Sequence, residues 1–191
     1  TISRNYKYNW YGQVQIRERV NGDIFIYTVR DNHYVYRFTR ISGTWNTSSG
    51  DGTESGGGVE SSSSQWGTGR TMRVDARATK FVSTRWNMHS GRNRIYIKDI
   101  ASDGALSEIT NKTSDLNDTS SKSGVSINEN GNTVIFSTYR PNSSKSEIEV
   151  YKFNNSAESP DYDKVGATLY IQNENYLGAW MAVNSDGDKI V

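Results

Sequence analysis

Cysteine is absent from this chain of 191 residues, and proline occurs only twice. Without cysteine there is neither a disulfide framework nor a thiolate metal site. No apolar run reaches the roughly 18 residues of a membrane-spanning helix, so membrane insertion is not expected. Neither sign of charge dominates, because 22 basic residues stand beside 21 acidic ones, and nucleic acid is therefore not an expected partner.

Polar and aromatic residues are abundant instead. Only 34% of the residues are hydrophobic and the mean hydropathy is -0.76, yet the chain has 12 tyrosines and 5 tryptophans. Leucine, alanine and glutamate, which favour helices, are scarce beside serine, threonine, asparagine, tyrosine and valine. Such a mixture is typical of an all-β domain with many polar turns.

The stretch from Gly124 to Phe153 contains the clearest strand pattern. Val125 and Ile127 alternate with polar neighbours, as in a strand with one buried face. Residues 128–132 supply the asparagine and glycine of a hairpin turn. The next residues, 134–136, form a continuous apolar run, so both faces of this second strand are expected to be covered. A third, alternating strand completes the stretch.

The same order of strands and turn recurs along the chain. Glycines open the copies at positions 12, 69, 124 and 178, which gives a period of roughly 55 residues. A four-stranded unit at this period predicts β-propeller blades. We expect blades at 12–67, 69–122 and 124–176 and a partial fourth at 178–191. Residues 46–65, rich in serine and glycine, are a linker or a long loop beside a weak outer strand, and we favour the loop.

Two segments resemble the FG-GAP, or integrin-α-like, propeller repeat. Residues 176–191 and 124–136 both place a glycine before a strand, an Asp-Gly or Asn-Gly turn after it, and then a short apolar strand. Gly43-Thr44-Trp45 is similar to the Gly-x-Trp that follows the third strand of such repeats. The resemblance implies a propeller with a binding or structural role, and it identifies no ligand.

Many repeats of that family carry a calcium loop between their first two strands. Calcium needs several oxygen ligands that converge from the loop. Around Asp186 the first and last ligand positions hold Ala182 and Ile190, and around Asn130 they hold Ser126 and Val134. We therefore interpret both as plain hairpin turns, and we expect neither a metal site nor a cofactor.

Three arginines suggest a binding surface. Arg30, Arg85 and Arg140 are spaced 55 residues apart, each near the end of a second strand. At equal heights on neighbouring blades they would grip carboxylate or phosphate groups of a glycan or protein, or else pair with acidic residues of adjacent blades. Flat aromatic residues that suit sugar rings or interfaces are expected on the connections of the same face: Trp66, Trp86, Tyr139 and Tyr176.

No nucleophile elbow, metal-ligand cluster or phosphate-binding glycine loop is present in the sequence, so we do not expect an enzyme. The predicted function is recognition or adhesion, through a protein or glycan partner, on the surface of a cell or particle. A structural part of a large assembly, such as a minor capsid or fibre protein of a virion, is the alternative. A glycan-acting enzyme is the third, least favoured interpretation.

The number of copies bears on how the sheets find partners. The chain begins at Thr1 without methionine or a signal-peptide pattern, and its fourth copy stops within a strand at Val191. Three copies and a fraction are fewer than the roughly four blades of the smallest closed rings. We therefore expect further blades, supplied by a longer chain or by a second copy.

Overall fold

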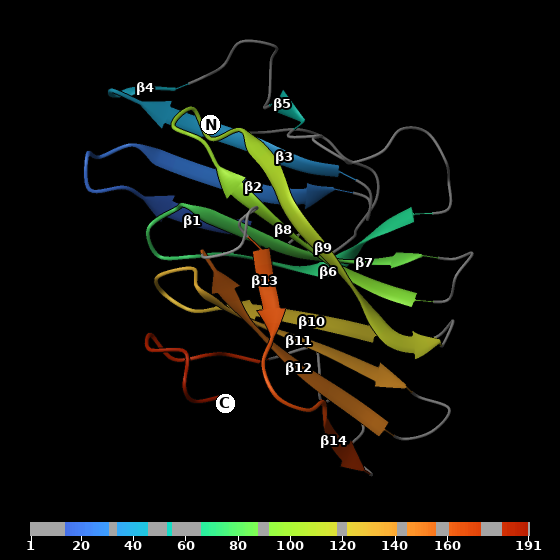
Figure 1. Cartoon of the computed structure of the whole chain (residues 1–191). Coiled ribbons are helices and arrows are strands. Elements are labelled where there is room, and N and C mark those ends of the chain that lie inside the picture. The colour runs from blue at the N-terminus through green and yellow to red at the C-terminus, as the bar shows by residue number, and fades with distance from the viewer. Residues whose placement is uncertain are drawn as a thin grey trace.

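The computed structural model describes residues 14–30, 34–45, 53–54, 66–87, 92–117, 122–140, 145–155, 161–172 and 181–190. These residues form three antiparallel sheets and no helix, which confirms the all-β prediction (Figure 1). Within the same ranges there is accordingly no helix long and apolar enough to cross a membrane. The three sheets form an open stack and do not close into a ring (Figure 1).

The first sheet, called sheet A, is a meander whose outer strand position is divided. Its strands are β1 (Val14–Glu18), β2 (Ile24–Arg30), β3 (Tyr34–Ile41), β4 (Thr44–Trp45) and β5 (Thr53–Glu54). Both β4 and β5 pair with β3, one near each end. The short β5 lies inside the stretch 46–65, so the expectation of a weak outer strand there is confirmed.

The second sheet, sheet B, is a continuous four-strand meander. It consists of β6 (Trp66–Val74), β7 (Lys80–Asn87), β8 (Arg92–Ile100) and β9 (Leu106–Asn117). The ladder between β6 and β7 shifts register between Thr68 and Met72, and β9 is likewise irregular against β8. The repeat is least regular in this copy, although its outer strand is the longest.

The third sheet, sheet C, again has a divided outer position. It contains β10 (Lys122–Ile127), β11 (Thr133–Arg140), β12 (Lys145–Asn154), β13 (Asp161–Lys164) and β14 (Leu169–Gln172). The sequence predicts one outer strand over 167–171, whereas β13 and β14 both pair with β12. Gly166, with a positive φ of 72°, lies in the turn that separates them. Residues 181–190 then form a turn with a single bridge between Val183 and Ile190.

The sheets pack face to face in chain order (Figure 1). We call the face toward the preceding sheet the leading face and the face toward the following sheet the trailing face. One buried cluster joins sheets A and B: Phe25, Tyr27, Met72, Val74, Ala78, Phe81, Ile100 and Leu106. A second joins sheets B and C: Val82, Ile95, Ile97, Val125, Ile127, Val134, Phe136, Tyr151 and Tyr162. A third joins the trailing face of sheet C to residues 181–190: Ile135, Ile148 and Met181.

The alternation of side chains along a strand explains this layering. Val134 and Phe136 belong to the cluster against sheet B, and Ile135 between them belongs to the cluster on the other side. All three are at most 1% exposed. The prediction that both faces of this second strand are covered is confirmed.

Candidate functional site

The most complete surface feature is the end of the stack that carries the first hairpin turn of each copy, which we call the turn face. Its turns comprise residues 19–23, 75–80, 128–133 and 184–189, and they lie one above another at the left of Figure 1. In each turn a residue with positive φ, Gly22, Ala78, Gly131 or Gly187, donates its N–H to the carbonyl oxygen three residues earlier. The turns are therefore the same local structure repeated four times.

One side chain closes each of the last three turns. The Oδ1 atom of Asp75 accepts hydrogen bonds from the N–H groups of Thr79 at 2.7 Å and Lys80 at 2.8 Å. Asn128 accepts in the same way from Thr133 N at 2.8 Å, and Asn184 accepts from the N–H groups of the two residues that end its turn. Aspartate and asparagine at these positions are thus structural, as is usual in turns of this kind.

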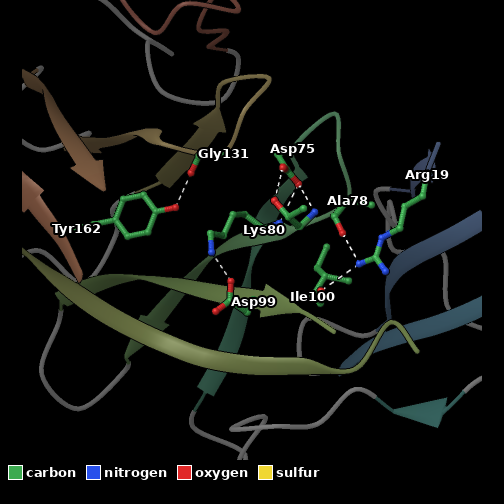
Figure 2. A network of polar contacts seen from close by, with 9 residues as sticks. Arg19, Asp75, Ala78, Lys80, Asp99, Ile100, Gly131 and Tyr162 are labelled. Carbon is green, nitrogen blue, oxygen red and sulfur yellow. Dashed lines mark hydrogen bonds and ion pairs between the residues drawn. The ribbon is translucent and has the colours of Figure 1, made fainter. Parts of the chain in front are cut away.

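Polar contacts join neighbouring turns into one row. Arg19, from sheet A, donates from Nη2 to the carbonyl oxygens of Ala78 at 2.7 Å and Ile100 at 3.0 Å (Figure 2). The N–H of Ala76 donates to Glu129 O at 3.1 Å. Each of these contacts runs from one sheet to the next, so the relative positions of the turns are held by hydrogen bonds as well as by the apolar clusters.

Further contacts continue the row toward its last turn. Asn128 Nδ2 donates to the carbonyl oxygen of Ser185 at 3.1 Å. Within sheet C, the hydroxyl of Tyr162 on the outer strand donates to Gly131 O in the third turn (Figure 2). The third turn is therefore tied both to the next turn and to the outer edge of its own sheet.

The four turns surround a hollow with a volume of about 530 Å³. Its lining comes from every copy: Glu18, Arg19, Val20, Ala76, Arg77, Glu129, Asn130, Ser185 and Asp186. Most of these residues occupy the central positions of their turns, where side chains project away from the sheets. The hollow is therefore a product of the stacking and belongs to no single copy.

The charges around the hollow fall into two groups. Arg19 is committed to carbonyl oxygens, and its guanidinium carbon also lies 4.5 Å from the centre of the Phe25 ring. By contrast, within the described part of the chain the side chains of Glu18, Arg77 and Glu129 form no hydrogen bond or ion pair. These charges of both signs remain available to a partner.

Two buried tyrosines beneath the turns are parts of the scaffold. Tyr27 is fully buried and donates its hydroxyl to Gly104 O at 2.9 Å. Burial, which disfavours the charged phenolate, raises the pKa of Tyr27 and of Tyr162 above the ordinary value of 10.0. Burial also lowers the pKa of Arg73, with a further contribution from the nearby Arg17 charge. The described ranges contain no group of three histidine, cysteine, aspartate or glutamate side chains placed to hold a metal ion.

The predicted arginines lie at the opposite end of the strands from the turns, which we call the arginine face. The structure describes their backbone positions and not their side chains. Arg30 and Arg140 occupy the last pair of their ladders, opposite Tyr34 and Lys145. Arg85 pairs with Arg94, two pairs before the end of its ladder.

The expectation of equal heights is therefore wrong for Arg85. The equivalent residues Ile24, Phe81 and Val134, each the partner of the last residue of a first strand, are 57 and 53 residues apart. A uniform spacing of 55 residues thus matches Arg30 with Arg140 and displaces Arg85 by two positions. The cause is that the spacing of the copies is uneven, although its average is 55.

The predicted aromatic residues have mixed positions. Trp66, Trp86 and Tyr139 lie in strand ends on the arginine face and not in the connections that the sequence suggested. Trp86 and Tyr139 hold equivalent places, each five residues beyond the equivalent residues Phe81 and Val134. Tyr176 lies outside the described residues. The role of all these side chains in binding stays a prediction.

Sequence reasoning missed the hollow and concentrated on the opposite face. A signal was present, because Arg77, Asn130 and Asp186 occupy the same turn position in successive copies. That signal becomes readable only when the turns are aligned by Asp75 and its counterparts, and not by the opening glycines.

Comparisons with known proteins add little to this geometry. No protein-family model matches the chain, and no curated protein matches it. Among solved structures, prolyl oligopeptidase B from Galerina marginata is similar, both bound to a 25mer macrocyclization substrate and as the apo protein. Both are 10% identical to this chain with a TM-score of 0.34, and the alignments cover 83% and 81% of it.

The chain spans about a third of the length of those structures, 32% and 31%. A TM-score of 0.34 is too low to transfer a fold or a function from that peptidase to this chain.

Proposed function

We propose that the chain is part of a β-propeller that acts as a non-catalytic recognition module for a protein or glycan on the surface of a cell or particle. The propeller interpretation is supported by three meander sheets that stack in chain order with equivalent residues at each interface. The resemblance to FG-GAP repeats agrees with it and suggests the surface location.

One observation carries the recognition proposal. The hollow of the turn face is lined by Glu18, Arg77 and Glu129, whose side chains have no partner among the described residues. Elsewhere on this face charged groups serve the scaffold, as Arg19 and Asp75 do. Charges of both signs around a concavity suit a partner that presents hydroxyl, amide and ionic groups.

The arginine face is a second contact surface in this proposal. Arg30 and Arg140 end equivalent strands, and Trp86 and Tyr139 also hold equivalent places. Arginine and aromatic residues together are frequent in interface anchors. The two faces lie at opposite ends of the strands, so their contributions can be separated by mutation.

A glycan array probed with the purified chain tests the proposal. If the turn face binds, the double variant Arg77→Glu/Glu129→Lys lowers the signal of a bound glycan at least about tenfold, a loss of about 1.4 kcal/mol. The matched control is Asp163→Lys, which reverses the charge of an exposed residue on β13. The double variant Arg30→Ala/Arg140→Ala tests the other face. A signal that survives both double variants contradicts recognition by either face.

A structural role in a large assembly is the second candidate. The observation that favours it is the exposure of apolar side chains on β1, where Val14 is 52% and Ile16 is 56% exposed. Exposed apolar patches on a sheet face are typical of surfaces that are covered in an assembly. Electron microscopy that finds ordered polymers of the purified chain would favour this candidate over recognition.

A further inference from the structure

Four residues hold the same place at the start of the four copies. Ile16, Met72, Val125 and Met181 each precede by three positions the residue that begins the turn, which is Arg19, Asp75, Asn128 or Asn184. Because side chains alternate along a strand, all four project from the leading face. Their burial can therefore be compared directly.

Three of the four are covered by the preceding sheet. Met72 is 0% exposed in the cluster with Phe25, Val125 is 3% exposed in the cluster with Val82, and Met181 is 8% exposed in the cluster with Ile135. Phe25, Val82 and Ile135 are themselves equivalent, since each is the second residue after its turn. The position is thus an interface position wherever a preceding sheet is present.

Ile16 is the exception. It is 56% exposed, and Val14 on the same face is 52% exposed. The strand pairing places Ile26 beside Ile16 and Phe38 beside Ile26, so the leading face of sheet A is apolar across three strands. At its turn end this face carries the opposite charges of Glu18 and Arg40, which flank Ile24 in the pairing.

The other end of the stack has an exposed apolar counterpart. Leu169 on β14 pairs with Ile148 and therefore lies on the trailing face of sheet C, where it is 53% exposed. Residues 181–190 cover the inner part of this face at Ile135 and Ile148. The outer part of the face is thus open, in the direction in which a following sheet would extend.

We propose that the leading face of sheet A packs against the trailing side of sheet C in a second copy of the chain. The continuity of this contact with the interfaces inside the chain identifies the partner, because Ile16 would then be buried as Met72, Val125 and Met181 are. Head-to-tail contact also buries Leu169, whereas two leading faces packed together would leave it exposed. Two such contacts close a two-fold ring, and contacts that do not close give a polymer. The inference rests on the stacking of the sheets and not on the proposed recognition of a partner.

Sedimentation velocity of the full chain over a range of concentrations tests this. The wild type is expected to form a species of about twice 21.5 kDa, or a ladder of higher masses. Ile16→Glu and Leu169→Glu should each weaken association at least about tenfold, because a carboxylate is buried in an apolar contact. The control is Tyr170→Glu, since Tyr170 is 65% exposed on the opposite face of β14 and its change leaves association intact.

Mixing the two variants distinguishes the mode of contact. In the head-to-tail arrangement Ile16→Glu keeps an intact trailing side and Leu169→Glu keeps an intact leading face, so the mixture regains one good contact and forms a heterodimer. Circular dichroism melting confirms that each variant is folded, which is expected because both residues are more than half exposed. A monomeric wild type at every concentration, or association that Ile16→Glu leaves unchanged, would overturn the proposal. Loss with Ile16→Glu alone and no rescue on mixing would overturn the head-to-tail mode.

Discussion

Removing the side chain that closes the second turn should destabilise the protein by an amount that the structure allows us to estimate. Asp75 is 1% exposed, and its carboxylate accepts two backbone N–H groups through Oδ1 and the Thr79 hydroxyl through Oδ2. Hydrogen bonds to a charged group contribute about 1.5–3 kcal/mol each. Thr79 is exposed, so water replaces part of what is lost. We expect Asp75→Ala to lower the free energy of unfolding by about 3 kcal/mol.

The Asp75→Asn variant separates geometry from charge. Asn128 and Asn184 close equivalent turns with an amide oxygen, so asparagine at position 75 should keep the bonds to the backbone. We expect it to cost no more than about 1 kcal/mol. The control is Asp163→Ala, because Asp163 is exposed and accepts only from Asn154 among the described residues. It should change stability by less than about 0.5 kcal/mol.

Urea unfolding followed by circular dichroism measures all three variants. For a chain of this length a loss of 3 kcal/mol corresponds to a fall of about 6–12 °C in Tm, which thermal melting checks independently. The slope of the urea transition should not change, since the folded and unfolded surfaces are the same. If Asp75→Ala unfolds at the wild-type midpoint, or if Asp75→Asn is as damaging as Asp75→Ala, then the turn does not depend on the oxygen at this position.

Two further predictions concern the turns and the core. Gly131→Ala should lower Tm more than Gly22→Ala, because both have positive φ but only at Gly131 would the new methyl lie 2.8 Å from a side-chain carbon of Lys80; we expect a difference of at least about 1 kcal/mol, and equal effects would refute the clash. Tyr27→Phe should cost about 1–2 kcal/mol by urea unfolding, because Gly104 O loses its buried donor. Because burial raises the pKa of Tyr27, the unfolded chain loses this proton at a lower pH than the folded protein does. Stability should therefore fall as pH rises above about 10, less steeply in Tyr27→Phe, and parallel pH profiles would contradict this.

The sequence alone determined the local structure of the chain. Alternation at Val125 and Ile127 and the apolar run at 134–136 predict strands and their covered faces, because the side-chain period of a strand is a local property. The asparagine and glycine of residues 128–132 predict a turn for the same reason, since positive φ is a property of single residues. Even Ala78, which takes a φ of 52° without being glycine, lies in a turn that the repeat predicts.

Only the tertiary structure decided which residues come together. The first turn is one residue shorter than the others, and the copies are unevenly spaced, so Arg85 falls two pairs away from the height of Arg30 and Arg140. The division of the outer strand into β13 and β14 likewise depends on pairing with a distant part of β12.

The hollow of the turn face and the exposure of Ile16 are also products of the stacking. Ile16 and Met72 have equivalent surroundings in the sequence, and they differ because one has a preceding sheet against it and the other does not. Burial is a property of the whole assembly of sheets, set by contacts between residues far apart in the chain. Periodicity therefore predicts which side of a strand is apolar, and only packing decides what that side touches.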